Sequence, residues 1–405
     1  MPPAPTKPQI VGSRSPFDPD EFLSSWSAES LPQDDDLRGS LTKAFDLPPR
    51  DSYVYRAIAE VTLDQVQHAI GFGGQHGLHG WYIDDEGKPV SQHHHSLCAQ
   101  NRDPRLEIAA PILTHPSAKV PPPPTTDIAA YTNIFSPSTS TASALRGLAS
   151  NAKKDSLRAA IAAHLQSQFH LAPAATSPAP LTLPNKRKQP FANPYYDYWA
   201  WSCHNLEWAG PWPATAQTRI SHHVLPVFYH HFGCAVPTWD ALSLVAQLTQ
   251  HAPPAPKPKG WPGRDVVEIG SGNGYWALQL RRAAGCRVAA VDNAHSEWRT
   301  MWIGDTVWAD GVKYLEGRGG AEEAVLLLVY PQVGADFTAK VLRAYRGDYV
   351  VVAGTQNGNG FTGFKDETIA EWMARERKEF ERVAQVPLPS FAGKDEALFV
   401  FVRRK

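Results

Sequence analysis

The residues best suited to chemistry fall within residues 264–298, where glycines and carboxylates stand at the ends of apolar runs. The β-branched run at 266–269 is long enough for a buried parallel strand and too short for a helix. Three alternating glycines at 270–274 follow it, and then apolar residues at helical spacing up to Gly285, which is placed to end the helix in a left-handed cap. A second apolar run at 287–291 then ends on Asp292. Strand, glycine turn, helix and strand in this order form half of a nucleotide-binding βαβ unit, with an acid placed to receive a ribose.

The type of nucleotide depends on the glycine spacing and on one nearby charge. The dinucleotide fingerprint G-x-G-x-x-G fails from Gly270, because its last position falls on Tyr275, although a shifted G-x-G-x-x-A can be read from Gly272 to Ala277. Glu268 precedes the first glycine by two residues, where a pyrophosphate would sit on the helix N-terminus. A carboxylate there repels a dianion but tolerates a ligand that carries an ammonium and a sulfonium.

The string EIGSGNG, residues 268–274, resembles motif I of the class I S-adenosylmethionine-dependent methyltransferases. The runs EIGSGNGYWA at 268–277, LLLVYP at 326–331 and RAYRG at 343–347 are together similar to a subgroup of that family whose members have no assigned substrate. The resemblance covers about residues 235–405. It implies S-adenosyl-L-methionine (SAM) as the cofactor and transfer of its methyl group to an acceptor.

The resemblance also implies roles for individual residues. Asp292 is expected to take the ribose hydroxyls, Asp310 to bind the adenine amino group, and Glu268 to face the cationic methionine end. Tyr330, in the loop nearest the methyl group, is the residue expected to touch the acceptor. That loop reads Tyr330-Pro331-Gln332 where the subgroup usually has Trp-Pro-Pro, so catalytic detail does not carry over. The full set of expected cofactor-binding residues is Glu268, Gly270, Ser271, Gly272, Asn273, Gly274, Asp292 and Asp310.

The apolar runs after Asp292 continue the alternation of strands and helices that a doubly wound sheet requires. We therefore expect an α/β fold with a doubly wound, mostly parallel, seven-stranded Rossmann-like sheet and an antiparallel C-terminal strand. A helical cap and a largely irregular N-terminal region precede it. The expected strands are 266–269, 287–291, 306–309, 325–329, 349–353, 382–388 and 397–402. We also expect helices at 53–70 and 366–383, and a hairpin or strand end with its turn at 83–90.

Composition divides the chain before the core. Pro, Ser and Asp dominate the first fifty residues, and Pro, Ser, Thr and Ala dominate a later stretch. The aromatic-rich stretch after Phe191 is interpreted as a hydrophobic cap or as an aromatic wall over the ligand. The expected organisation is a disordered region at 1–50, a small segment of unknown role at 51–116, a linker with one helix (153–169) at 117–190, and a methyltransferase domain at 191–405, with a helical preamble at 191–263 and the core at 264–405.

Charge and cysteine content exclude some classes of partner. Lys and Arg total 39 against 40 for Asp and Glu, so no overall field draws the chain to nucleic acid or to an anionic membrane. The four cysteines are far apart, and the histidines at 93–95 have no partner ligand at metal spacing. His223 and His230 could share one face of a helix, but a metal site there is the weaker interpretation, so no metal is expected. We expect a cytoplasmic protein, or a nuclear one if the basic triplet at 186–188 is a signal.

Two other functions stay open beside methyl transfer. One is a module with the SAM-binding fold but without catalysis, which would bind a protein partner through its N-terminal region. The other is an NAD(P)-binding oxidoreductase, although the sequence has no Ser-Tyr-x-x-x-Lys catalytic set. For the methyltransferase the acceptor is unidentified, and a small molecule is favoured over protein or RNA because the charge is near neutral and the aromatic stretch suits a planar ligand.

Overall fold

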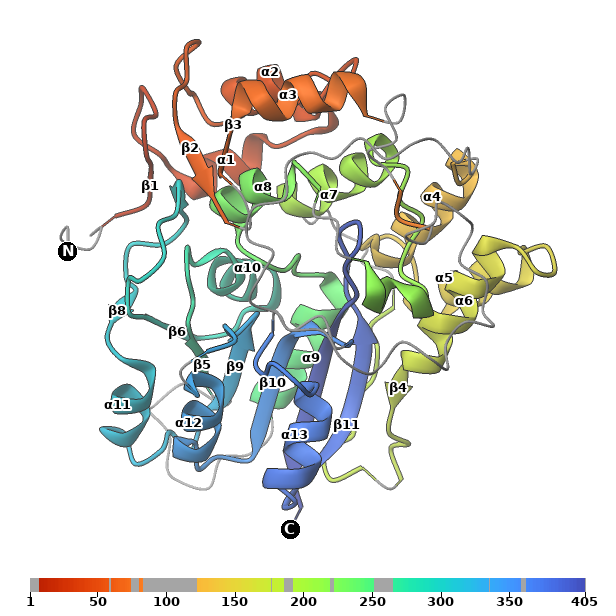
Figure 1. Ribbon diagram of the computed structural model, residues 1–405. Coiled ribbons are helices and arrows are strands. Elements are labelled where there is room, and N and C mark those ends of the chain that lie inside the picture. The colour runs from red at the N-terminus through yellow and green to blue at the C-terminus, as the bar shows by residue number, and fades with distance from the viewer. Residues whose placement is uncertain are drawn as a thin grey trace.

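A mixed α/β architecture surrounds one eight-stranded sheet (Figure 1). The structure is a computed structural model, and it describes residues 7–57, 60–73, 80–82, 122–175, 177–185, 192–218, 222–250, 265–334, 336–357 and 362–404. In spatial order the strands are β4 (His170–Leu171), β11 (Phe380–Pro387), β12 (Glu396–Arg403), β10 (Tyr349–Thr355), β9 (Val325–Val329), β5 (Val266–Ile269), β6 (Val288–Asp292) and β8 (Val307–Trp308).

The sheet is parallel from β10 through β9, β5 and β6 to β8, and β12 runs antiparallel between β10 and β11. This agrees with the expected mostly parallel sheet with an antiparallel C-terminal strand. The sheet has eight strands rather than the predicted seven, because His170 and Leu171 pair with Gln385 and Ala384 at the edge of β11. Those two residues belong to the segment that we predicted to be a linker, and their short, mixed sequence gives no strand signal.

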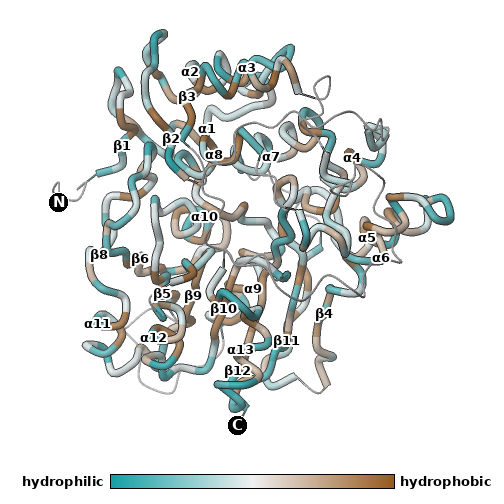
Figure 2. The backbone as a smooth tube through the Cα atoms, in the orientation of Figure 1, coloured by the Kyte–Doolittle hydropathy of each residue, from teal (hydrophilic) through white to brown (hydrophobic). Residues whose placement is uncertain are grey.

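Helices cover both faces of the sheet. On one face lie α9 (Trp239–Thr249) and α10 (Tyr275–Ala284), and on the other lie α11 (Gly311–Glu316), α12 (Phe337–Ala344) and α13 (Ile369–Glu376). Val266 of β5 is buried in the core that includes α9 and α10, whereas its neighbour Val267 is buried with α12 and α13. Alternate side chains of a strand point to opposite faces, so the apolar run is buried on both sides. Figure 2 shows the same strands as the hydrophobic centre of the molecule.

Two helices near the sheet test the predicted boundaries. Gly285 caps α10 in the left-handed conformation at φ 68°, as the sequence predicts. The charged helix predicted at 366–383 is shorter, since α13 ends at Glu376 and the chain enters β11 at Phe380.

The N-terminal region folds against the core. It contains β1 (Gln9–Ile10), α1 (Pro19–Ser25), the 3-10 turn η1 (Ala28–Ser30), α2 (Leu37–Ala44), the hairpin β2 (Val54–Arg56) and β3 (Glu60–Thr62), and α3 (Leu63–Phe72). Leu23, Leu37 and Phe45 are buried in the same core as the sheet. The predicted disorder is therefore wrong for residues 7–50, because these short helices gain stability from long-range packing rather than from their own periodicity. The helix predicted from residue 53 begins only at Leu63, after the hairpin.

The stretch predicted as a linker is largely helical in residues 122–175. It forms α4 (Thr125–Thr132), η4 (Asn133–Phe135), α5 (Thr141–Ser150) and α6 (Leu157–Gln168). The expected single helix is α6, but Tyr131 of α4 and Leu145 of α5 are also buried in the common core. The core therefore continues across residue 190, where we predicted the start of the main domain.

The aromatic-rich stretch forms α7 (Pro194–Asn205), η5 (Pro213–Gln217) and α8 (Leu225–Phe232), which lie beyond the carboxyl ends of the parallel strands in Figure 1. The indole nitrogens of Trp199 and Trp208 both donate to the carbonyl of Ser390, at 3.1 and 2.9 Å. Both rings are fully buried. Most of this aromatic surface is thus a cap packed against the core.

Candidate functional site

The glycine bend, residues 270–274, joins β5 to α10. Gly270, Gly272 and Gly274 all have positive φ, at 76°, 55° and 80°, a conformation that favours glycine. A Cβ at Gly274 would lie 2.3 Å from Cγ1 of Ile303, so this glycine is needed for packing. A Cβ at Gly270 would meet nothing within 4 Å. The backbone at Gly270 therefore faces open space beside the N-terminus of α10.

Asp292 ends β6 and is bonded directly to the bend. Its Oδ2 accepts from the amide of Gly272 at 2.8 Å and its Oδ1 accepts from the amide of Ala294 at 2.8 Å. The amides of Gly270 and Ser271 both donate to the carbonyl of Val291, at 2.8 and 3.0 Å. The side chain is half-buried, and this burial raises the pKa of the carboxyl group. The acid and the glycines that the sequence placed together thus meet in space.

Glu268 lies beneath the bend and is 1% exposed. Burial raises the pKa of its carboxyl group to about 8, with Arg281 acting in the opposite direction. Its Oε2 is buried and has no hydrogen-bond partner in the described residues. An orphaned buried carboxyl oxygen is uncommon in folded proteins, since such groups are nearly always paired.

Ser271 and Asn273 differ in what their side chains do. The hydroxyl of Ser271 is buried without a hydrogen-bond partner among the residues that the structure describes. The amide nitrogen of Asn273 donates to the carbonyl of His231 at 3.1 Å, and its Oδ1 accepts from the amide of Tyr275 at 3.2 Å. The Asn273 side chain therefore ties the bend to α8 and to the start of α10.

Asp310 follows β8 at the same edge of the sheet and is exposed. It caps α11, where its Oδ1 accepts from the amide of Lys313 at 2.9 Å. The preceding residue, Ala309, donates its amide to the carbonyl of Asp292 at 2.9 Å. The two acids are thus joined through the backbone of neighbouring strands.

Tyr330 follows β9 directly and has a left-handed backbone conformation at φ 51°, which is uncommon for a bulky residue. Its amide donates to the carbonyl of Ala353 at 2.7 Å. Its hydroxyl donates to Oε1 of Glu396 at 3.4 Å, and its ring meets that of Tyr229 edge-on at 6.3 Å. Burial raises the pKa of the Tyr330 hydroxyl.

Parallel pairing of β8, β6, β5 and β9 brings the predicted residues to one edge of the sheet, where ligands bind in open α/β folds. A direct hydrogen bond joins Asp292 to the bend. Tyr330 follows β9, the strand next to β5, and its hydrogen bonds go to Ala353 and Glu396 instead. Sequence reasoning missed Glu396 and Trp298. A Cβ at Gly272 would lie 2.8 Å from Cζ2 of Trp298, which covers the bend there. Neither residue carries a local signal, because each reaches the site through the fold.

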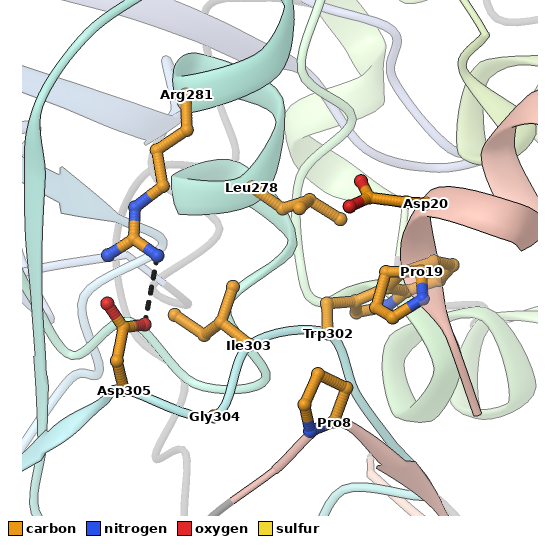
Figure 3. A pocket seen from close by; sticks show the side chains of 9 residues that line it. All are labelled: Pro8, Pro19, Asp20, Leu278, Arg281, Trp302, Ile303, Gly304 and Asp305. Atoms are coloured by element: carbon orange, nitrogen blue, oxygen red, sulfur yellow. Dashed lines mark hydrogen bonds and ion pairs between the residues drawn. The ribbon is translucent and has the colours of Figure 1, made fainter. Parts of the chain in front are cut away.

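A hollow of about 380 Å³ lies between the N-terminal region and the outer side of α10. Figure 3 shows Pro8, Pro19 and Asp20 on one side of it and the Arg281–Asp305 ion pair on the other. None of the predicted site residues lines it. This hollow is therefore distinct from the glycine bend.

The histidine pair at 230–231 is used within the fold. His230 bonds to the hydroxyl of Tyr53 at 2.9 Å, and His231 bonds to the hydroxyls of Tyr55 and Thr300 at 3.2 and 2.9 Å. Among the described residues, no group of three or more His, Cys, Asp or Glu side chains is arranged to hold a metal ion. The histidines at 93–95, the basic triplet at 186–188 and the turn predicted around residues 83–90 lie outside the described residues.

The helices within the described ranges include none with the length and hydropathy to cross a lipid bilayer.

Several solved structures resemble part of this chain. A scan against protein-family models finds no match, and a search of curated proteins finds none. The chain is similar to a SAM-dependent methyltransferase from Agrobacterium tumefaciens, with 11% identity and a TM-score of 0.25 over 39% of this chain and 60% of that chain. It is also similar to TYW2 of P. horikoshii in complex with MeSAdo, with 11% identity and a TM-score of 0.20 over 35% of this chain and 58% of that chain. The chain thus spans about three fifths of the length of each.

Proposed function

We propose that this chain is a SAM-dependent methyltransferase that passes a methyl group by in-line displacement to a small-molecule acceptor. The observation that carries the proposal is the bend itself: a left-handed glycine turn with a buried acid beneath it and a second acid bonded to it. The two solved structures are too dissimilar, with low identity and low TM-scores, to serve as support for this proposal.

The residues at the bend fit a cationic nucleoside. Open space at Gly270 would let the backbone approach a ligand closely, and the orphaned oxygens of Glu268 and Ser271 could each take a ligand proton. The bend would hold the cofactor, Asp292 would accept from the ribose hydroxyls, and Asp310 would lie toward the adenine. When bound, SAM supplies a methyl group on a positively charged sulfur. The protein contributes chiefly orientation, worth up to about 7–11 kcal/mol in such displacements.

The charges at the bend disfavour a dinucleotide. A pyrophosphate at the N-terminus of α10 would lie near Asp292, and this carboxylate is not neutralised by a close ion pair in the described residues. Like charges in a partly buried setting repel strongly. The oxidoreductase alternative is therefore the weaker one. The alternative of a non-catalytic module loses its main motivation, since residues 7–57 pack on the core and are not a loose binding arm.

A thermal-shift titration tests the proposal. S-adenosylhomocysteine, SAM, NAD and NADP are each titrated against the full chain, and only the first two are expected to raise the melting temperature. Turnover is then sought with methyl-labelled SAM and the protein, RNA and small-molecule fractions of a cell extract, with label expected in the small-molecule fraction. Stabilisation by NAD alone, or cofactor binding without any label transfer, would contradict the proposal.

A further inference from the structure

Glu396 is a buried acid next to the residue expected to touch the acceptor. It begins β12 and pairs with Thr355 at the end of β10, so it lies at the same edge of the sheet as Tyr330. The residue is 2% exposed. Its Oε1 accepts from the Tyr330 hydroxyl at 3.4 Å, and its Oε2 is buried with no hydrogen-bond partner in the described part of the chain. The pair is thus joined through one oxygen while the second stays unused.

The surroundings of Glu396 hold its proton affinity high. Burial raises the pKa of this carboxyl group, and burial lowers the pKa of the nearby Lys394 ammonium group. Asp395, which precedes β12, also acts to raise the pKa of Glu396, while the Lys394 charge acts to lower it. Burial raises the pKa values of Tyr229 of α8, Cys234 after it and Tyr195 of α7, and the nearby Glu396 charge acts in the same direction on all three. A carboxylate in this setting is a stronger base than an exposed one.

The backbone conformation of Tyr330 indicates that the orientation of its side chain matters for function. A bulky residue at φ 51° has an unfavourable backbone conformation. Two hydrogen bonds hold it there, one from the Tyr330 amide to the Ala353 carbonyl and one from the Tyr330 hydroxyl to Glu396. Such conformations persist only where the surrounding structure fixes them, and they gather at functional sites. The Tyr330 hydroxyl proton is directed at Glu396, and the side chains of Thr355 and Tyr229 are the other hydrogen-bonding neighbours of this hydroxyl.

We propose that Tyr330 and Glu396 form a proton relay for the methyl acceptor, which is a neutral nitrogen or oxygen nucleophile that carries a proton. This inference rests on the proposed methyltransferase function and adds the class of acceptor. As the bond from the nucleophile to the methyl carbon forms, the bond from sulfur to that carbon breaks and its electron pair stays on sulfur. The nucleophile's proton passes to the Tyr330 oxygen while the Tyr330 proton passes to Glu396. The products are S-adenosylhomocysteine, the methylated acceptor and a neutral Glu396, which later returns its proton to water.

Within this scheme Tyr330 is the catalytic residue, because it contacts the acceptor. Glu396 is a positioning residue that orients the Tyr330 hydroxyl and receives its proton. The relay works only when Glu396 is ionised, so the rate is expected to rise with pH through a group whose pKa lies above the ordinary glutamate value. A thiolate nucleophile has already lost its proton and would have no need for such a group.

The test compares the wild-type chain with Glu396→Gln, Tyr330→Phe and Asp395→Asn. Asp395 is the matched control, because it is an adjacent buried acid whose oxygens bond to His164 at 2.8 Å and to Gln356 at 2.5 Å instead. Each protein is incubated with methyl-labelled SAM and the small-molecule fraction of a cell extract over a series of pH values. Mass spectrometry identifies the atom that receives the methyl group. A thermal shift with S-adenosylhomocysteine reports separately on the cofactor site.

We expect Glu396→Gln and Tyr330→Phe to keep the wild-type thermal shift while the transfer rate falls by about 10²- to 10⁴-fold. The rising limb of the pH profile should vanish in Glu396→Gln and persist in Asp395→Asn, displaced to lower pH because Asp395 acts to raise the pKa of Glu396. The product should be methylated on nitrogen or oxygen. Tyr330→Phe removes the relay but keeps the Glu396 side chain. If Glu396→Gln does not fold, the transfer rate of Tyr330→Phe alone tests the relay.

Two results would overturn the relay: a wild-type rate and pH profile in either relay variant, or a product methylated on carbon or sulfur. A wild-type chain that S-adenosylhomocysteine fails to stabilise, or that binds it without transferring label, would instead overturn the proposed function itself.

Discussion

The glycine bend and the N-terminal region are built in opposite ways. Partners at the bend are close in sequence, because Asp292 bonds to an amide only 20 residues before it. The N-terminal region is held by distant partners: the two terminal guanidinium nitrogens of Arg299 donate to Asp51, 248 residues away, at 2.6 and 2.7 Å. The Arg299 side chain is fully buried and also lies 4.5 Å from the Tyr53 ring centre. The comparison teaches that local chemistry can be read from the sequence, while long-range anchoring cannot.

Breaking the anchor should have the largest effect. Arg299→Ala leaves the buried Asp51 carboxylate without its ion pair, and removing one partner of such a pair costs about 3–5 kcal/mol. We expect the free energy of unfolding to fall by that amount in denaturant titrations. The control is Glu60→Gln, which breaks the exposed pair with Arg56 and should cost no more than about 1 kcal/mol. Equal losses in the two variants would show that the N-terminal region is not anchored by Arg299.

Glu268, the acid beneath the bend, should make the stability of the fold decrease as pH rises. The pKa of Glu268 is raised from 4.5 to about 8, so between these values the folded chain keeps a proton that the unfolded chain has lost. Stability contributed by this group is therefore present at low pH and disappears as pH rises through that window. Glu268→Gln should be more stable than wild type by roughly 2–4 kcal/mol above about pH 9 and similar to it near about pH 5. Parallel pH–stability curves for the two proteins would contradict this expectation.

The two ends of the bend should respond differently to the same substitution. Gly274→Ala places a Cβ against Ile303 and should cost about 1–3 kcal/mol more than Gly270→Ala, which bears only the backbone cost of its left-handed conformation. Chemical denaturation measures the difference. Gly270→Ala should still fold but lose affinity for S-adenosylhomocysteine, since its methyl group enters the open space. Full retention of affinity in Gly270→Ala would remove that position from the ligand site.

Removing the acid at the end of β6 should weaken cofactor binding without unfolding the chain. Asp292→Ala removes a charged acceptor that is expected to receive the ribose hydroxyls, so affinity for S-adenosylhomocysteine should fall by about 1–3 kcal/mol in calorimetric titration. Asp310→Ala serves as the comparison, because Asp310 is exposed and caps α11, and a smaller loss of affinity is expected. Unchanged affinity in Asp292→Ala would exclude its ribose role.

The sequence indicated the elements whose signals are local. The apolar run of β5, the cap of α10 at Gly285 and the position of Asp292 all follow from residues near them in the chain. Glu396 was missed because its partner Tyr330 is 66 residues away and becomes adjacent only through the order of β9, β10 and β12. The helices α1 and α2 were missed because their few apolar residues are buried by other segments rather than by each other.

Direct calorimetric titration of the full chain with S-adenosylhomocysteine and, separately, with NAD tests the central claim. We expect saturable binding of S-adenosylhomocysteine that weakens in Asp292→Ala, and no competing binding of NAD. Binding of NAD at the bend, with S-adenosylhomocysteine left unbound, would contradict it.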